Sequence, residues 1–356
     1  MNSSKVTTGT RQKQFLDAAK RGDLEYIMFL ETLGVNINCR SGEYGKEDAV
    51  YIAIDNGHED IAIHLIDNEN YDLEFCTEYG RTHLMNASEK AMLKVMEKLY
   101  ERGVDIYAQD RLGNLASMYA CRSGVIEAIK FYVDKGHKDI FKYRNNNGET
   151  HLIVASQNKS KNGENPVASY ILTINNENVF SKDCKGNNVF KYAFDEDAYV
   201  LMDELARYGI EKFGIHSPFI NVESVGCAKV FIKYGFDVND INHEHETVLF
   251  RIHNVNDELC KFFMSLDKVD VNKKNIEGDT AIIHLLSDKS NYWGRKLTKD
   301  LIEKRGADIL IKGSKGKTAS ELVRKQDIQD GFIFTRSIFY RYLKKVEKQQ
   351  KRKLKY

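Results

Sequence analysis

Three short stretches contain residues whose types and spacing could do chemistry. The first, Gly316-Lys317-Thr318, matches the end of a phosphate-binding loop, in which backbone N–H groups and a Lys hold phosphate oxygens. That loop needs another Gly five residues before its second Gly, and residue 311 is Ile. The stretch therefore predicts the start of a structural element and not a nucleotide site.

The second stretch, His243-Glu244-His245-Glu246, brings together two imidazoles and two carboxylates, which are common metal ligands. It falls in an expected hairpin tip and lacks the i, i+4 spacing that places two His on one face of a helix. His58, His83 and His151 stand at recurring places in the pattern described below, which indicates a structural role. We therefore predict no metal site, no cofactor and no catalytic residue.

The third stretch is the basic C-terminal tail, residues 344–356, which carries a formal charge of +6 against −5 for the rest of the chain. Basic runs can bind nucleic acid or other anions, and a solvated, frayed helix end has the same composition. The candidate anion-binding residues of the tail are Lys344, Lys345, Lys348, Lys351, Arg352, Lys353 and Lys355.

The element that must position all three stretches is a unit of 33 residues, seen most clearly between Gly80 and Asp110. Thr82 is placed to cap a short first helix. In a second helix, Met92, Val95, Met96 and Leu99 share one face, at i, i+3, i+4 and i+7. Gly103 then marks a left-handed helix end. Two helices this short cannot bury their apolar faces alone, so the unit must stack against copies of itself.

This unit resembles the ankyrin repeat, whose pattern has about 33 residues and a Thr-Pro-Leu-His-x-Ala signature. Thr82-His83-Leu84-Met85 and Thr150-His151-Leu152-Ile153 keep the Thr and the Leu but have His in place of Pro. Residues 53–61 reproduce the family's Ala-x-x-x-Gly-His-x-x-Ile joint between the two helices. The resemblance implies divergent repeats whose stacking rests on their apolar positions.

The predicted fold is mainly α, an ankyrin-repeat solenoid of stacked helix-turn-helix units with short hairpin loops. About nine or ten repeats cover residues 11–343, after a flexible N-terminal segment at 1–10 and before the basic tail at 344–356. An irregular joint is expected near 209–224. Polar insertions are expected at 157–165 and 287–294, and a final helix from 335 to about 345 should cap the stack.

Composition agrees with a single long stack and excludes several classes of protein. The chain has 356 residues, 2 Pro and a net charge of +1, so it contains no Pro-rich linker and is not a polycation as a whole. Six dispersed Cys without a Cys-x-x-Cys pair indicate reduced thiols in a cytoplasmic or nuclear compartment. We expect no secretory signal and no membrane-spanning segment.

The resemblance implies a non-enzymatic module that binds a protein partner through its concave face and hairpin tips. Interfaces favour Tyr, Trp and Arg as anchors. We expect such residues near the tips, and in the insertion of the ninth repeat, to project rather than pack. The candidate contact residues are Tyr44, Tyr79, Arg81, Arg111, Leu112, Tyr292 and Trp293.

Two other functions stay open. One is association with nucleic acid through the basic tail, and the other is an enzyme with a site in the irregular region 209–246. The abundance of Lys, Asn, Ile and Tyr and the scarcity of Pro are common in AT-rich coding sequences, which suggests a viral or intracellular-pathogen factor that modulates a host protein. The sequence gives no oligomeric state, and we take a monomer as the default.

Overall fold

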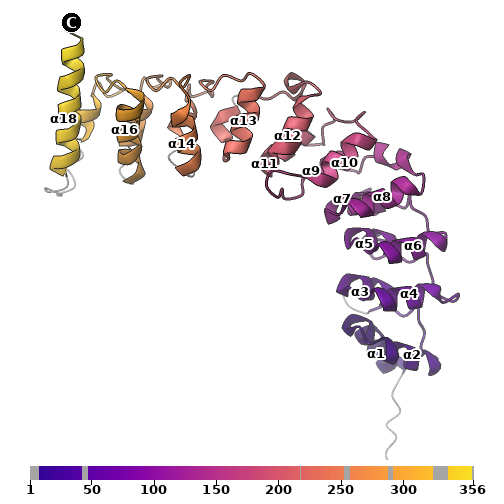
Figure 1. Ribbon diagram of the computed structural model, residues 1–356. Coiled ribbons are helices and arrows are strands. Elements are labelled where there is room, and N and C mark those ends of the chain that lie inside the picture. The colour runs from indigo at the N-terminus through magenta and orange to yellow at the C-terminus, as the bar shows by residue number, and fades with distance from the viewer. Residues whose placement is uncertain are drawn as a thin grey trace, which may run out of the picture. The chain divides into compact units, whose positions relative to one another are not determined.

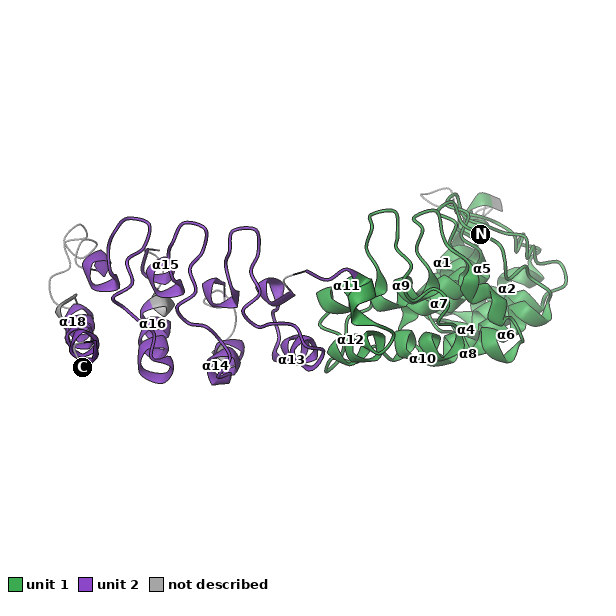
Figure 2. Cartoon of the chain, turned by 90° about the horizontal axis from the view of Figure 1, so that it is seen from above, with its two compact units in different colours: residues 1–213 green, residues 214–356 purple. Residues whose placement is uncertain are grey.

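A computed structural model describes residues 8–41, 47–216, 218–251, 257–287, 292–323 and 336–354. The chain divides into two compact units, residues 1–213 and 214–356 (Figure 2). Each unit is a stack of short helices, and the described residues form isolated β-bridges but no strand. The predicted mainly α fold of stacked repeats is confirmed.

Unit 1 consists of paired helices that lie in successive layers (Figure 1). The first helix of each pair packs on the first helix of the next pair, and the second helices likewise stack on one another. We name the former inner helices and the latter outer helices. The inner helices are α1 (Thr8–Arg21), α3 (Ala49–Asn56), α5 (His83–Glu89), α7 (Ala116–Ser123), α9 (His151–Ser156) and α11 (Val189–Asp195). The outer helices are α2 (Leu24–Thr32), α4 (Glu59–Asp67), α6 (Leu93–Glu101), α8 (Ile126–Asp134), α10 (Pro166–Ile174) and α12 (Tyr199–Ala206), and the 3₁₀ turns are η1 (Lys138–Lys142) and η2 (Ile210–Phe213).

Unit 2 repeats the same pattern with shorter inner elements. Two of its inner elements are single 3₁₀ turns, η3 (Pro218–Asn221) and η4 (Val248–Phe250). Its other elements are α13 (Val225–Lys233), α14 (Asp257–Ser265), α15 (Ala281–Ser287), α16 (Tyr292–Arg305), a helical turn at 319–323, and α18 (Arg336–Lys353). Outer helices α13, α14 and α16 pack in sequence, and α15 packs on η4 and α16.

The residues that predicted the repeat behave as expected in the third repeat. The Thr82 hydroxyl accepts a hydrogen bond from the Met85 N–H and so caps α5. On α6, Val95, Met96 and Leu99 are fully buried between the two layers. Gly103 has φ +79°, the left-handed conformation that a glycine adopts without steric cost.

The structure corrects two predicted boundaries in unit 2. Tyr292 and Trp293 belong to the first turn of the outer helix α16 and not to an insertion. The final helix α18 runs to Lys353, past the predicted end near Lys345, so most of the basic tail is helical. The longer helix is stabilised by Glu347, which forms ion pairs with Lys344 at i−3 and Lys351 at i+4.

Candidate functional site

The hairpin loops project to one side of the helices of each unit (Figure 2). The loop before α7 is a tight turn in which the Gly113 N–H donates to the Asp110 carbonyl at 2.9 Å. Asp110 Oδ1 also accepts from the backbone N–H groups of Leu112 and Asn114, at 2.9 and 2.8 Å. The buried Asp110 side chain thus accepts the hydrogen bonds of the turn's backbone N–H groups. The side chains of Arg111 and Leu112 lie at the exposed tip of the turn.

Neighbouring tips are joined by backbone hydrogen bonds. The Arg111 N–H donates to the Tyr79 carbonyl at 3.0 Å. Gly80, beside Tyr79, has φ +77°, and a Cβ at this position would lie 3.2 Å from the Arg111 nitrogen. The tips of the third and fourth repeats therefore hold Tyr79 and Leu112 on one rigid edge, where these side chains are 63% and 55% exposed. We name Tyr79, Arg111 and Leu112 the tip patch.

A second group of side chains lies behind the tip patch, on the inner helices α5 and α7 and on the loops that enter them. The Arg81 guanidinium forms an ion pair with Glu89 and lies 4.4 Å from the centre of the Tyr119 ring. The Arg122 guanidinium contacts the same ring, at 5.1 Å from its centre. The Tyr119 hydroxyl donates to Asp110 Oδ2 at 2.6 Å. These five residues, the inner-helix cluster, connect the tip of the fourth repeat to its inner helix.

Burial and hydrogen bonding in the inner-helix cluster fix the protonation states of Tyr119 and Asp110. Burial, and then the hydrogen bond to Asp110, raises the pKa of Tyr119 to about 12, so its hydroxyl keeps its proton and donates. Burial also acts to raise the pKa of Asp110, but hydrogen bonds from Tyr119 and Asn114 outweigh it and hold that pKa below its ordinary value. The carboxylate is therefore ionised at neutral pH and is satisfied within the protein.

The predicted contact residues divide into three groups. Tyr79, Arg111 and Leu112 are exposed and are brought together on adjacent tips. Arg81 was expected to project, which is wrong: its side chain is only 25% exposed because it pairs with Glu89 and packs on Tyr119. Three residues fall outside this comparison. Tyr44 lies outside the described residues, as do the side chains of Tyr292 and Trp293.

Sequence reasoning missed Arg122 and Glu89, although a signal for them exists. Aligned on the residue that precedes each inner helix, the seventh following residue is polar in five consecutive repeats. These residues are Asp55, Glu89, Arg122, Gln157 and Asp195. A position that stays polar in repeat after repeat marks the face of the inner helix that leaves the core.

His83 and His151, which recur at equivalent places in the sequence, stabilise the stack. His83 Nε2 lies 3.0 Å from both carboxylate oxygens of Asp48, which caps α3 in the preceding repeat, and 3.0 Å from the Tyr71 hydroxyl. The His151 Nε2 lies 2.8 Å from the Ser117 hydroxyl, and burial lowers the pKa of His151 to about 3. Both side chains are buried between repeats and are closed to substrate.

In the region 209–246, described polar side chains that could serve a reaction already bind other residues of the protein. The Glu246 carboxylate accepts from the side-chain amide of Asn242 at 3.2 Å and pairs with Arg251 at 3.1 Å. His243 is exposed and lies 3.9 Å from Glu244. Among the residues that the structure describes, no three His, Cys, Asp or Glu side chains are grouped as metal ligands.

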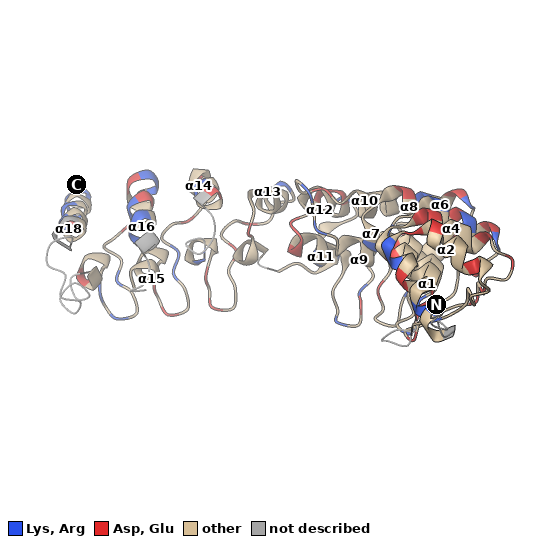
Figure 3. Cartoon of the chain, turned by 90° about the horizontal axis from the view of Figure 1, so that it is seen from below, with Lys and Arg blue, Asp and Glu red and all other residues tan. Residues whose placement is uncertain are grey.

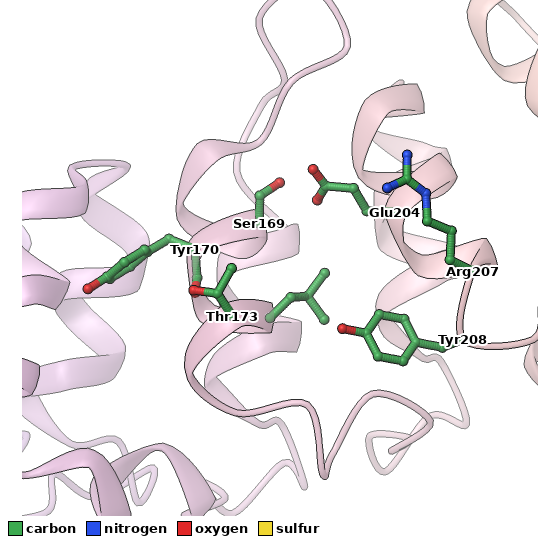
Figure 4. A pocket seen from close by; sticks show the side chains of 7 residues that line it. Ser169, Tyr170, Thr173, Glu204, Arg207 and Tyr208 are labelled. Carbon is green, nitrogen blue, oxygen red and sulfur yellow. The ribbon is translucent and has the colours of Figure 1, made fainter.

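One pocket of about 560 Å³ lies between the outer helices α10 and α12 (Figure 4). Ser169 faces Glu204 across it, while Tyr170 points away, toward Lys130 of α8. Arg207 at its rim is held by Asp203 at 3.0 Å. The lining residues come from successive turns of two stacked outer helices, so this groove follows from the stacking and does not collect groups for a particular reaction.

The packing of α18 divides the described cations of the basic tail into those that pair with Glu347 and those without a carboxylate partner. Lys344 and Lys351 are bound by Glu347. Lys345, Lys348, Arg352 and Lys353 are exposed and have no carboxylate partner among the described residues, and Lys355 lies outside the described residues. Within the described part of the chain, no helix is long and apolar enough to cross a membrane.

Comparison with known proteins agrees with this architecture. Residues 15–110 match the family model "Ankyrin repeats (3 copies)". A stretch of 171 residues is 28% identical to a Plasmodium falciparum (isolate 3D7) protein named "Putative E3 ubiquitin-protein ligase protein". That match covers 45% of this chain but spans only 2% of the length of the relative. The matched model, together with the helix pairs that continue beyond residue 110, supports an ankyrin-repeat architecture, and ankyrin repeats indicate a protein-interaction module.

Proposed function

We propose that the inner-helix side of unit 1 binds a protein partner, with the tip patch as its anchor and Arg122 as a charged contact behind it. The observation that supports this most directly is the exposure of Tyr79 and Leu112 on adjacent tips whose backbones are fixed to each other. Because the backbones of the two tips are already fixed to each other, little backbone entropy is lost on binding, and Tyr is among the side chains that most often act as hot spots.

Arg122 adds a charge to this surface that the protein itself does not satisfy. Its guanidinium packs on the Tyr119 ring, and in the described part of the chain no carboxylate pairs with it. Arg81, on the same ring, is already paired with Glu89. Arg122 is therefore the cation in this cluster that is available to a carboxylate of the partner, while the Tyr119 ring holds it in place.

The amino-acid composition of the chain indicates where its protein partner should be sought. The abundance of Lys, Asn, Ile and Tyr, which is common in AT-rich coding sequences, supports a viral or intracellular-pathogen source, and we propose a host intracellular protein as the partner. The cysteines support an intracellular site of action, because all six are free thiols.

The test is affinity capture of the tagged full-length protein from host-cell lysate treated with nuclease, with quantification of each captured protein by mass spectrometry. The double variant Tyr79→Ala/Leu112→Ala should lose a defined set of proteins by at least tenfold. The matched control Phe29→Ala/Leu93→Ala removes an aromatic ring and a leucine that are also exposed, but on outer helices α2 and α6. This control should keep the same set. Equal capture by the two double variants would contradict the proposal.

A further inference from the structure

Helix α18 packs on the preceding repeat of unit 2 through one face. Leu343 is fully buried, and the Ser320 hydroxyl donates to Glu347 at 2.8 Å. Gln350 donates to the Ala307 carbonyl at 2.9 Å and accepts from the Ile309 N–H at 3.1 Å. These contacts recur every three or four residues, so they fix the rotation of α18 about its own axis.

The opposite face of α18 carries a row of cations. Arg341, Lys345, Lys348 and Arg352 are spaced at i, i+4, i+7 and i+11, which places them within an arc of about 60° on a helix of 3.6 residues per turn. All four side chains are exposed, and none has a carboxylate partner in the described part of the chain. Blue segments along α18 in Figure 3 show this concentration of Lys and Arg. We name these four residues the basic stripe.

We infer that the basic stripe binds the phosphate backbone of duplex nucleic acid without reading its sequence. Eleven residues of helix span about 16 Å at a rise of about 1.5 Å per residue. One strand of a duplex presents a phosphate every 3.4 Å or so along its axis, so about five phosphates pass a row of this length. Four cations on one straight edge can therefore each meet a phosphate.

The surroundings of the basic stripe favour this ligand over other polyanions. A protein partner needs apolar or aromatic anchors, but the exposed neighbours on α18 are Gln349, Lys351 and Lys353. An interfacial membrane helix needs an apolar face toward the lipid, and the apolar face of α18 is used in packing, as at Leu343. Single strands are bound by stacking on exposed aromatic rings, and none of the described aromatic rings of α18 is exposed. Contacts to duplex phosphates need none of these features.

The experiment measures fluorescence anisotropy of a labelled DNA duplex of about 20 base pairs with the full-length protein between 50 and 200 mM salt. Four phosphate contacts predict a slope of about −3.6 for log K against log salt, which weakens binding on the order of 100-fold over this range. The variant Arg341→Gln/Lys345→Gln/Lys348→Gln/Arg352→Gln should lose measurable binding while keeping the thermal midpoint of the parent protein.

The control variant removes four cations that are paired with carboxylates elsewhere on the surface. Lys90, Lys94, Lys130 and Lys191, each replaced by Gln, lower the net charge by the same amount. This control should keep the salt slope of the parent protein. Equal loss in both variants would show attraction by net charge alone and would overturn the inference, as would an absence of binding at 50 mM salt.

Competition separates duplex nucleic acid from other polyanions. Polyglutamate or vesicles rich in phosphatidylserine, at matched charge concentration, should displace the labelled duplex at least tenfold less effectively than unlabelled duplex. Equal displacement would overturn the assignment to nucleic acid. The tip-patch variant Tyr79→Ala/Leu112→Ala should bind the duplex like the parent protein, so the two proposals can fail separately.

Discussion

The Arg81 guanidinium lies 4.4 Å from the centre of the Tyr119 ring, so the loop that enters the third repeat packs on the inner helix of the fourth. Arg81 also pairs with Glu89 on α5. Through these two contacts Arg81 positions the surface behind the tips, whereas the adjacent Tyr79 and Leu112 present apolar area to solvent. The distinction matters because a variant at Arg81 tests stability before it tests binding.

We expect Arg81→Ala to lower the free energy of unfolding by about 1 to 2 kcal/mol, since it removes a cation–π contact and leaves the half-buried Glu89 unpaired. Urea unfolding followed by circular dichroism measures the change. The matched control Arg111→Ala removes an exposed guanidinium at the next tip and should cost less than about 0.5 kcal/mol. Equal costs for the two variants would refute the positioning role of Arg81.

We expect Asp48→Ala to be far more damaging than Asp55→Ala on the same helix. Asp48 caps α3 by accepting from the Tyr51 N–H and also receives the buried His83 and Tyr71 side chains, so its loss should cost about 3 kcal/mol or more. Asp55 forms an ion pair with Lys90 on the surface and should cost below about 1 kcal/mol. Urea unfolding of both variants measures the two costs. Similar unfolding midpoints for Asp48→Ala and Asp55→Ala would contradict this prediction.

Two glycines with similar backbone angles should respond differently to substitution. Gly103 has φ +79° and open space where a Cβ would stand, so Gly103→Ala should cost about 1 kcal/mol from the left-handed conformation alone. At Gly80 the Cβ would also press on backbone atoms of Asp110 and Arg111, 3.2 Å away, and we expect about 2 kcal/mol. Amide hydrogen exchange at Arg111 should accelerate in Gly80→Ala but stay unchanged in Gly103→Ala. An Arg111 exchange rate that changes equally in both variants, or only in Gly103→Ala, would be evidence against the rigid tip edge.

The capping of unit 2 by α18 should depend on pH. Burial acts to raise the pKa of Glu347, but hydrogen bonds from Lys344, Lys351 and Ser320 outweigh it and lower that pKa from 4.5 to about 2. Because the folded pKa is the lower one, the stabilisation of about 2 kcal/mol is complete above pH 4.5 and is lost as the pH falls toward 2.

The measurement for this prediction is hydrogen exchange in α18 of the parent protein and of Glu347→Gln. At neutral pH the variant should exchange faster in α18, and after correction for intrinsic rates the difference should shrink near pH 3. Exchange in α6, which belongs to the other unit, serves as an internal control. A difference between the two proteins that does not change with pH would contradict the role of Glu347.

The sequence by itself determined the repeat and hence the fold class. Apolar residues such as Val95, Met96 and Leu99 recur with helical spacing, and Thr82 and Gly103 mark where helices begin and end. These signals are local, because helix spacing, capping and left-handed turns each depend on a few consecutive residues. The same reasoning placed Tyr79, Arg111 and Leu112 at the tips.

Only the tertiary structure decided which side chains near those tips are free and which are held. Arg81 and Arg122 have the same chemistry in the sequence, but Arg81 is paired with Glu89, whereas no carboxylate in the described part of the chain pairs with Arg122. In the tail, the packing of Leu343 and Glu347 on the preceding repeat set the rotation of α18 and so decided which described cations pair with Glu347 and which have no carboxylate partner. Partners more than a turn apart in the chain, such as Asp48 and His83, meet through the stacking of repeats. Such distances depend on the packing of whole layers, which no local pattern contains.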